Sequence, residues 1–337
     1  MFEEPRAQSR DLPTRKRCRR LLKQFTTAKE LPLSAIPTPP LTVEAFGAQL
    51  LKSGDLDPTY IAINEAKLDQ KTLHRLCLAY WCYYHLGAAA KMAEAKSDKA
   101  YWSLMMQAAV YSPVSELNKP GHQPWPRGAE RRHYRGAQAV SSMASLQSRY
   151  NTPTDAVRGM TTNGQLEKVT FTQIMNRVKT HRGFGSWIGF KIADMTERVL
   201  RFPVDFADCE LQFYDEPRKG AALVFFESEP AARWPVAGGE IPYADTPWDY
   251  PIRDEDFKTT VARLIKHFRN HKALGLTHRK PDLFETETVL CKYKSYRRGH
   301  YPIGKDTKEV LHSLEGWGDL AKQLKTGLLN AGVQVRV

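Results

Sequence analysis

The stretch His181-Arg182-Gly183-Phe184-Gly185-Ser186-Trp187-Ile188-Gly189 separates two segments with helical periodicity. An apolar stripe runs along residues 173–178, and apolar residues fall on one helical face of residues 187–200. Glycine permits positive φ and a close approach of the backbone, and the amide N–H groups that start a helix can bind an anion. The sequence therefore predicts a helix, a Gly-x-Gly hairpin and a second helix at about 173–200, which together can hold one phosphodiester.

A carboxylate follows the second predicted helix. Arg201-Phe202-Pro203 ends that helix, and Val204 to Asp208 could begin another one. The position of Asp205 just beyond the second helix strengthens a functional interpretation of this region. Aspartate is also a preferred helix cap, so a structural role for Asp205 or Asp208 stays open. His181 could contact a phosphate or serve as a structural histidine.

The composition is that of a folded globular protein with a basic bias. The chain has 337 residues, of which 42% are hydrophobic, and a formal net charge of +13. This length suits one large or two modest domains, which excludes general disorder. The charge favours a polyanionic partner, because summed positive potential attracts phosphate groups. A merely soluble basic protein is the alternative.

Cysteine spacing and hydropathy limit the class of protein further. The five cysteines are scattered without a Cys-x-x-Cys pair, so neither a disulfide framework nor a cysteine-rich metal site is indicated. No apolar run approaches the roughly 18 residues of a membrane span, and the chain does not start like a secretory signal. We expect a cytoplasmic location and no membrane partner.

Proline and hydrophobic periodicity divide the chain. Residues 1–40 are predicted to form a basic arm and a linker that contains four prolines at its end. Residues 41–337 are predicted to form one domain, and they contain no internal repeats. The expected fold class is mainly α, with long loops and little strand. We expect helices within residues 42–112 and at about 254–272 and 306–332, and a short strand at 222–226. Thr42 is the predicted start of the first helix, Gly54 and Gly87 are predicted helix ends, and Asp306 to Glu309 is a predicted capping box.

Arginine and aromatic residues are interleaved in residues 125–150. Arg131, Arg132 and Arg135 lie near Trp125 and Tyr134 in the sequence. Guanidinium groups beside aromatic rings suit phosphate contact with base stacking. A solvated basic loop would have the same composition.

The hairpin region resembles the helix-hairpin-helix signature of the base-excision DNA glycosylase superfamily. The resemblance covers His181 to Gly189 and Pro203-Val204-Asp205. It implies that Arg182, Gly183, Phe184, Gly185 and Ser186 grip the DNA backbone and that Asp205 points into a flipped-base pocket. The sequence departs from the bifunctional glycosylases, because Lys191 lies beyond the position of their Schiff-base lysine. Phe206-Ala207-Asp208 also stands where many members have Thr-His.

The C-terminal third resembles a different family with the same helical fold. Glu285 to Lys294 and Gly299 to Asp306 are similar to the phage α-glutamyl/putrescinyl thymine pyrophosphorylases, also described as amino acid:DNA transferases. The resemblance implies that an amine displaces pyrophosphate from a modified thymine, 5-hydroxymethyluracil activated as its pyrophosphate ester. The implied partners are double-stranded phage DNA carrying that base and a free amino acid or polyamine.

The resemblance assigns candidate roles to particular residues. A base-flipping fold would expose the 5-substituent of the base. Asp205 or Asp208 could accept the proton of the amine or hold its ammonium. No cofactor is firmly implied; a divalent cation such as Mg²⁺ could share the charge of the leaving group, although no compact ligand motif indicates one. The side chains that could neutralise departing pyrophosphate are Lys292, Lys294, Arg297, Arg298 and Lys305.

Two other functions compete with the transferase. A DNA glycosylase would use Asp205 to stabilise positive charge on the sugar and would release free base. A non-catalytic DNA-binding protein would use the hairpin and the basic arm, with salt-sensitive binding that does not depend on Asp205.

Overall fold

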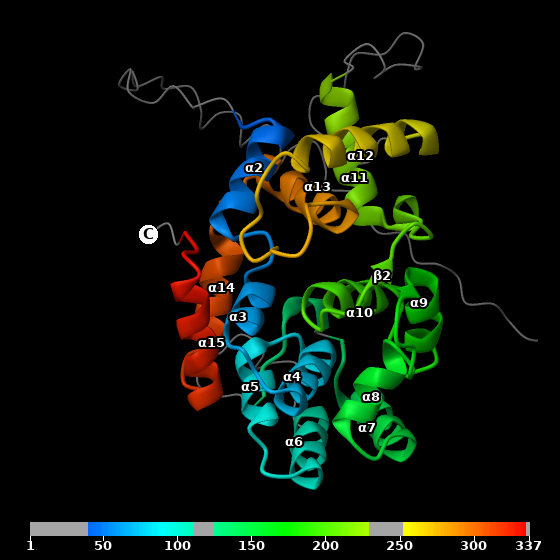
Figure 1. Cartoon of the computed structure of the whole chain (residues 1–337), viewed down its shortest axis with the longest axis vertical. Coiled ribbons are helices and arrows are strands. Elements are labelled where there is room, and N and C mark those ends of the chain that lie inside the picture. Colours follow the sequence, from blue (N-terminus) through cyan, green and yellow to red (C-terminus); the bar gives the residue numbers. More distant parts are fainter. Residues whose placement is uncertain (1–39, 111–124, 132, 229–251, 335–337) are drawn as a thin grey trace, which may run out of the picture. The chain divides into compact units, whose positions relative to one another are not determined.

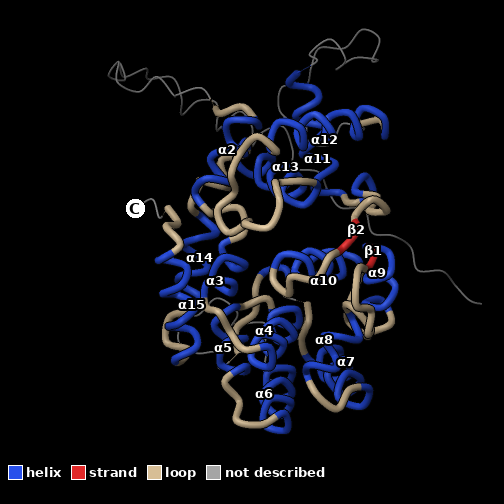
Figure 2. Tube along the Cα trace, in the orientation of Figure 1, coloured by secondary structure: helices blue, strands red, loops and turns tan. Residues whose placement is uncertain are grey.

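The structure is a computed structural model that describes residues 40–110, 125–131, 133–228 and 252–334. Arg132 and nearly all of the predicted basic arm lie outside the described residues. The described part is mainly α, as predicted, with two two-residue strands (Figures 1 and 2).

The helices fall into three consecutive groups along the chain. The first comprises α2 (Val43–Ser53), α3 (Pro58–Glu65), α4 (Gln70–Tyr83), α5 (Leu86–Ala93) and α6 (Asp98–Val110). The second comprises η2 (Ala129–Arg131), α7 (Gly136–Arg149), α8 (Pro153–Met160), α9 (Phe171–Lys179), α10 (Ser186–Arg198) and η3 (Leu211–Phe213). The third comprises α11 (Asp215–Ser228), α12 (Asp254–Phe268), α13 (Leu283–Arg297), α14 (Lys305–Ser313) and α15 (Asp319–Asn330). In Figure 1, α10 lies between α4–α8 and the helices α11, α12 and α13.

Two short strands close the helix pair α9 and α10. β1 (Val169–Thr170) precedes α9, β2 (Val204–Asp205) follows α10, and the strands pair in parallel with Val169 opposite Val204. The prediction that Val204 could begin another helix is therefore wrong. The amide of Val169 donates to the carbonyl of Pro203 at 3.2 Å, so backbone pairing holds this segment extended.

Helix α4 forms the centre of the first group. Every residue from His74 to Tyr83 is buried, consistent with aromatic and apolar residues on all faces of this helix. Thr42 caps α2 and Gly54 ends it with φ +78°, as predicted. Gly87 lies inside α5, so its predicted role as a helix end is wrong. A side chain there would place its Cβ 2.0 Å from the carbonyl oxygen of Ser313, so Gly87 serves close packing instead.

Residues 222–226 belong to α11, so the strand prediction is wrong. Their β-branched and aromatic side chains are accommodated by tertiary packing, because α11 lies directly on α13. Gly220 permits this approach, since a Cβ there would lie 2.4 Å from the carbonyl oxygen of Leu290.

The predicted C-terminal helix is two helices, α14 and α15. Its predicted capping box is also wrong, because Gly304 with φ +96° occupies the N-cap of α14 and makes no side-chain cap. The carboxylate of Asp306 instead pairs with Lys292, 2.6 Å away. Gly316 and Gly318, both with positive φ, separate the two helices.

We expect stability to fall on mild acidification through His74. Burial, assisted by the charge of Arg158, lowers the pKa of His74 from 6.5 to about 4. The neutral ring therefore supports the fold above pH 6.5, and this contribution is lost as the pH falls toward 4. Urea unfolding should show a loss of about 1.4 kcal/mol per pH unit from this residue. A His74→Phe variant should lose less over the same window, and equal slopes in the two proteins would contradict the assignment.

Candidate active site

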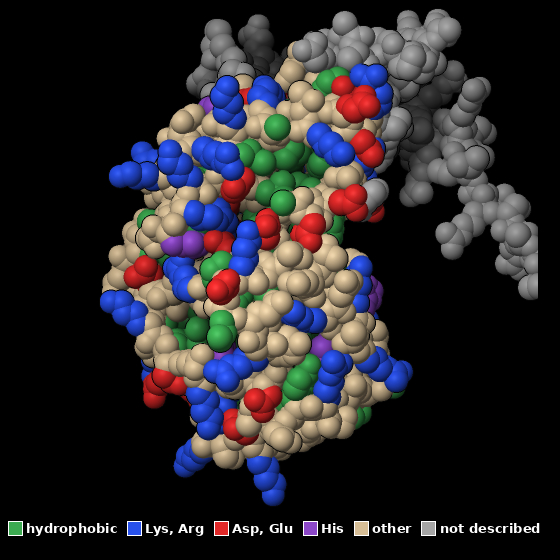
Figure 3. All heavy atoms as spheres, turned by 45° about the vertical axis from the view of Figure 1, so that its right-hand side comes forward, with side chains coloured by type: hydrophobic (Ala, Val, Ile, Leu, Met, Phe, Trp, Pro, Cys, Tyr) green, Lys and Arg blue, Asp and Glu red, His purple; other side chains and the backbone are tan. Residues whose placement is uncertain are grey.

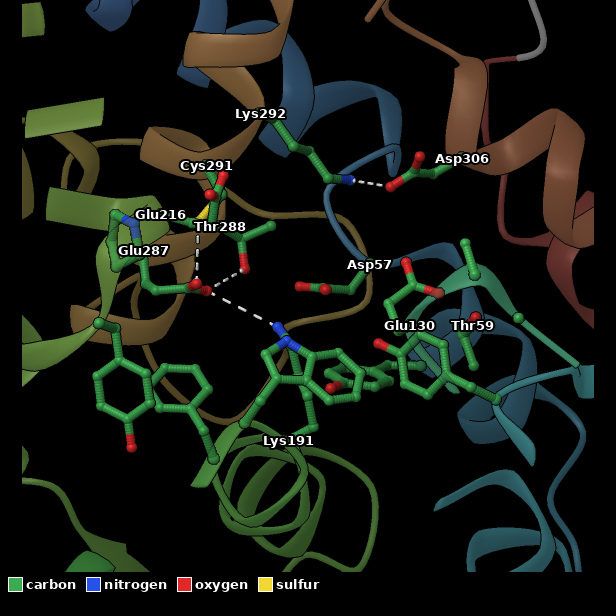
Figure 4. A pocket seen from close by; sticks show the side chains of 18 of the residues that line it. Asp57, Thr59, Glu130, Lys191, Glu216, Glu287, Thr288, Cys291, Lys292 and Asp306 are labelled. Carbon is green, nitrogen blue, oxygen red and sulfur yellow. Dashed lines mark hydrogen bonds and ion pairs between the residues drawn. The ribbon is translucent and has the colours of Figure 1, made fainter. Parts of the chain in front are cut away.

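A cavity of about 1330 Å³ opens between α10 and α13 (Figure 4). Residues of α3, α4, α5, η2, α9, α11 and α14 also line it. We call it the α10–α13 cavity. Its lining combines aromatic rings with lysines and carboxylates, the mixture expected where an enzyme binds a ring that carries charged groups.

Aromatic side chains form one wall of the cavity. Tyr80 and Tyr84 stack with ring centroids 4.6 Å apart, and the ring of Trp187 meets Tyr84 edge-on at 5.1 Å. Tyr84 adopts φ +52° where it ends α4, which turns the chain toward the cavity. Trp187 is 38% exposed, a large apolar surface that faces the cavity at the first turn of α10. This wall offers a flat surface to a guest ring.

An oriented carboxylate, Glu287, faces the other side of the cavity. Its Oε2 accepts a hydrogen bond from the Thr288 hydroxyl at 3.1 Å and lies 3.7 Å from Nζ of Lys191. Its Oε1 accepts a hydrogen bond from Sγ of Cys291 at 3.1 Å. Figure 4 shows these three side chains converging on Glu287 from α10 and α13.

Lys191 is an ammonium in this site. Burial lowers its pKa, but the carboxylates of Glu287, Asp194 and Asp57 outweigh burial and hold the pKa above the ordinary value. A permanently protonated lysine stabilises negative charge and is a poor nucleophile.

Lys292 supplies a second positive charge, at the edge formed by α13 and α14. Its Nζ lies 2.6 Å from Oδ2 of Asp306 and donates to the carbonyl oxygens of Asp55 and Leu56 at 2.5 and 2.7 Å. Carboxylates gather beside it, because Asp57, Glu130 and Glu309 also line the cavity. Burial and the charge of Asp306 raise the pKa of Glu309, so a cationic guest would be stabilised here.

The two predicted catalytic aspartates lie in different places. Asp208 lines the α10–α13 cavity, and it also accepts a hydrogen bond from the amide of Thr172 at 3.2 Å in the first turn of α9. Asp205 lines a separate cavity of about 470 Å³. Its carboxylate lies 2.7 Å from Lys168 and accepts from the amide of Ala207, and both contacts lower its pKa. Catalytic roles for both remain predictions.

The predicted DNA-binding hairpin is the turn between α9 and α10. Gly183 has φ +80°, and Gly185 has open space where a Cβ would stand. Arg182, Gly185 and Ser186 are exposed, whereas Phe184 is buried beneath the turn. Ser186 also lines the α10–α13 cavity. The turn therefore has an exposed backbone supported by an apolar anchor, and DNA contact by it remains a prediction.

Arg131 supports the hairpin from within. The guanidinium is buried over the ring of Tyr134, and it donates to the carbonyl oxygens of Cys82 at 3.0 Å and Gly183 at 2.9 Å. Arg135 is half-buried. The structure thus shows Arg131 binding the backbone of its own chain, and contact of either arginine with DNA stays a prediction.

Of the five predicted pyrophosphate-binding residues, Lys292 alone lines the α10–α13 cavity. Lys294 pairs with Glu216, and Arg297 pairs with Glu227 and donates to the hydroxyl of Tyr293. Lys305 lies near Glu309, and Arg298 is exposed. In Figure 3, Lys and Arg side chains are spread over the visible face and interspersed with Asp and Glu.

The described residues were compared with the usual grouping of metal-ligating side chains. Within them, no group of three or more His, Cys, Asp or Glu side chains is arranged to hold a metal ion. The sharing of leaving-group charge by Mg²⁺ remains a prediction. The same residues contain no helix with the length and apolar character of a membrane span.

The sequence matches a protein family and two phage transferases. A family model described as amino acid:DNA transferase matches residues 49–301. The chain belongs to the amino acid:DNA transferase family. It is 37% identical over 282 residues to a glycinyltransferase of Pseudomonas phage PaMx11, covering 84% of this chain and 93% of that protein. It is 28% identical over 277 residues to a putrescinyltransferase of Delftia phage PhiW-14, covering 82% and 79% of the two chains.

Membership in the amino acid:DNA transferase family confirms the resemblance drawn from residues 285–306. The chain is therefore a transferase enzyme that acts on DNA. The glycosylase and the non-catalytic DNA-binding protein are not favoured.

The sequence analysis did not identify the residues at the centre of the α10–α13 cavity. Trp187 and Lys191 are four residues apart on α10, and Glu287 and Cys291 are four apart on α13. This spacing places both members of each pair on one helical face. It is the signal that could have identified them, once residues 283–297 were assigned to a helix.

Proposed function

We propose that this transferase displaces pyrophosphate from 5-(pyrophosphoryloxymethyl)uracil in phage DNA with the primary amine of an amino acid or polyamine. The observation that supports it is the composition of the α10–α13 cavity, where an aromatic wall faces the Lys191–Glu287 pair. The double-stranded DNA substrate and a cytoplasmic site of action in the host belong to the same proposal, because both relatives are phage proteins.

The aromatic wall would receive the base. A base inside a duplex cannot present its 5-substituent to a buried carboxylate, so the nucleotide must leave the stack. Trp187, in the first turn of α10, provides a ring face for the extruded uracil. Stacking of this kind contributes about 1–3 kcal/mol per base. The adjacent turn at Gly183 to Ser186 would hold the DNA backbone through exposed amides.

Two lysines would take the charge of the leaving group. Departing pyrophosphate develops negative charge in the transition state, and fixed cations in a partly dry site stabilise it. Lys191 and Lys292 both line the α10–α13 cavity, and each already has a carboxylate partner that fixes its position.

The carboxylates beside α14 would bind the donor amine. Asp57, Glu130 and Glu309 line the cavity, and their charge attracts an ammonium group. Figure 4 shows Glu130 on the side of the cavity away from Glu287, with Asp57 between them. The amine must be neutral when it attacks, so a carboxylate has to accept its proton. Asp208 is the predicted acceptor that lines this cavity.

Mass spectrometry of modified DNA tests the function. Purified protein would be incubated with duplex DNA containing the pyrophosphorylated base and with glycine, glutamate or putrescine, and the DNA then digested to nucleosides. We expect one new nucleoside whose mass matches one donor. An unchanged nucleoside profile would overturn the proposal. Formation of an abasic site would instead show that the protein is a DNA glycosylase.

We expect Trp187→Ala to weaken binding of the modified base rather than unfold the chain. Trp187 is 38% exposed, so its truncation removes a stacking surface at little cost to the core. Loss of about 1–3 kcal/mol of stacking predicts a roughly 5- to 150-fold rise in the KM for modified DNA. Leu166→Ala is the matched control, because Leu166 is 92% exposed and does not line the cavity. An unchanged KM in the Trp187 variant would exclude it as the stacking surface.

A further inference from the structure

Cys291 occupies a chemically distinct place among the cysteines. Cys77 and Cys82 are fully buried, whereas Cys291 is partly exposed and lines the α10–α13 cavity. It lies one helical turn after Glu287, and its Sγ donates to Oε1 of that carboxylate at 3.1 Å. Figure 4 shows the thiol and the carboxylate joined by a dashed line on the left of the view.

The surroundings of Glu287 direct it toward that thiol. Lys191 and Thr288 both contact Oε2, which leaves Oε1 to Cys291. Burial and the charge of Glu287 raise the pKa of the Cys291 thiol, so the sulfur is protonated at rest. Such a thiol needs an adjacent base to become a nucleophile, and the structure provides one within hydrogen-bond distance.

We propose that Cys291 attacks C6 of the uracil ring and that Glu287 takes the thiol proton. The proposal rests on the proposed function, because it needs a uracil whose 5-methylene carries pyrophosphate. C6 of uracil is conjugated with the C4 carbonyl, so addition of sulfur there moves the ring electrons onto O4 as an enolate. That enolate lies next to the carbon that bears the leaving group.

The remaining steps balance without another reagent. The enolate expels pyrophosphate, which leaves an exocyclic C5=CH2 double bond on a ring still bonded to Cys291. The neutral donor amine adds to this methylene and regenerates the enolate, which then expels the sulfur and restores the C5=C6 double bond. Glu287 returns the proton to the thiolate, and the product leaves as its ammonium form with pyrophosphate.

Lys191 is placed to assist these reaction steps. Lys191 is an ammonium beside Glu287, and it can stabilise the pyrophosphate that departs. Direct displacement at the methylene would need no sulfur, so the two routes differ in their dependence on Cys291 and in the geometry at C6.

Single-turnover transfer by Cys291→Ala and Cys291→Ser tests the role of the thiol. We expect each variant to lose at least about 10³-fold in rate with unchanged DNA affinity and thermal unfolding, since a covalent route loses its nucleophile. Cys209→Ser is the control, because Cys209 is also partly exposed but does not line the cavity. Wild-type rates in both Cys291 variants would overturn the proposal while leaving the transferase function intact.

A second measurement distinguishes a nucleophile from a structural thiol. The substrate would be duplex DNA whose pyrophosphorylated base carries deuterium at C6. Attack at C6 changes that carbon from trigonal to tetrahedral, so we expect an inverse secondary isotope effect and, without amine, a protein–DNA adduct at Cys291. An isotope effect of unity with no adduct would overturn the proposal. Absence of any product from the wild-type protein would instead count against the proposed function.

Discussion

Replacing Glu287 with glutamine is expected to lower the rate of transfer by about 10²–10⁴-fold, the usual contribution of a positioned proton acceptor. Glutamine keeps the size of the side chain and can still accept the hydrogen bond from Thr288. It cannot take a proton from Cys291, whose Sγ lies 3.1 Å from Oε1. Single-turnover rates at saturating DNA would measure the loss.

A matched variant separates chemistry from general damage to the cavity. Glu216 also lines the α10–α13 cavity, but its side chain is 60% exposed and pairs with Lys294. Glu216→Gln should therefore retain most of the activity. Equal losses in the two variants would show that negative charge in the cavity matters in general, and would contradict a specific role for Glu287.

Replacing Arg198 with methionine is expected to destabilise the protein by about 3–5 kcal/mol, the cost of leaving buried charges without their partner. The side chain of Arg198 is 5% exposed and pairs with Asp57, while its Nε lies 3.5 Å from Oε1 of Glu285. Asp194 lies 3.9 Å away, and its Oδ1 has no hydrogen-bond partner among the described residues. Equilibrium unfolding in urea would measure the change.

An exposed arginine gives the comparison for Arg198. Arg263 forms an ion pair with Glu44 at 3.1 Å, but its side chain is 49% exposed. Exposed pairs contribute about 0–1 kcal/mol, so Arg263→Met should unfold almost as the wild type does. A similarly small effect at Arg198 would mean that water reaches its carboxylates.

Loss of Arg198 should also weaken substrate binding in the active site. Asp57 lines the α10–α13 cavity and is held there by Arg198 from α10. Without that guanidinium the carboxylate loses its fixed position, so binding of the donor amine should weaken in any Arg198 variant that remains folded. The KM for the amine should rise more than the KM for DNA.

The lysine in the cavity disfavours the Schiff-base route of the bifunctional glycosylases. A Schiff-base mechanism requires a neutral amine on the second helix of the hairpin motif. Lys191 is the lysine of α10 that lines the cavity, and nearby carboxylates keep it protonated. Its position opposite Glu287 suits charge stabilisation during transfer.

Much of the fold could be predicted from local patterns. Helical periodicity identified the pair at about 173–200 and the helices within residues 42–112. The predictions that failed depend on partners distant in sequence. Residues 222–226 form a helix because α11 packs on α13, and Val204 is extended because β2 pairs with β1.

The sequence alone determined the helical class, the glycine turn and the transferase family. The first two depend on the spacing of nearby residues, and the family on continuous motifs. Only the tertiary structure decided which charged residues share the cavity. Lys292 faces it, whereas its neighbour Lys294 does not, since successive helical residues point in different directions. Cys291 and Lys191 both contact Glu287 because the tertiary structure places α10 and α13 around the same cavity. That arrangement joins residues about 100 positions apart in the chain, which no local pattern encodes.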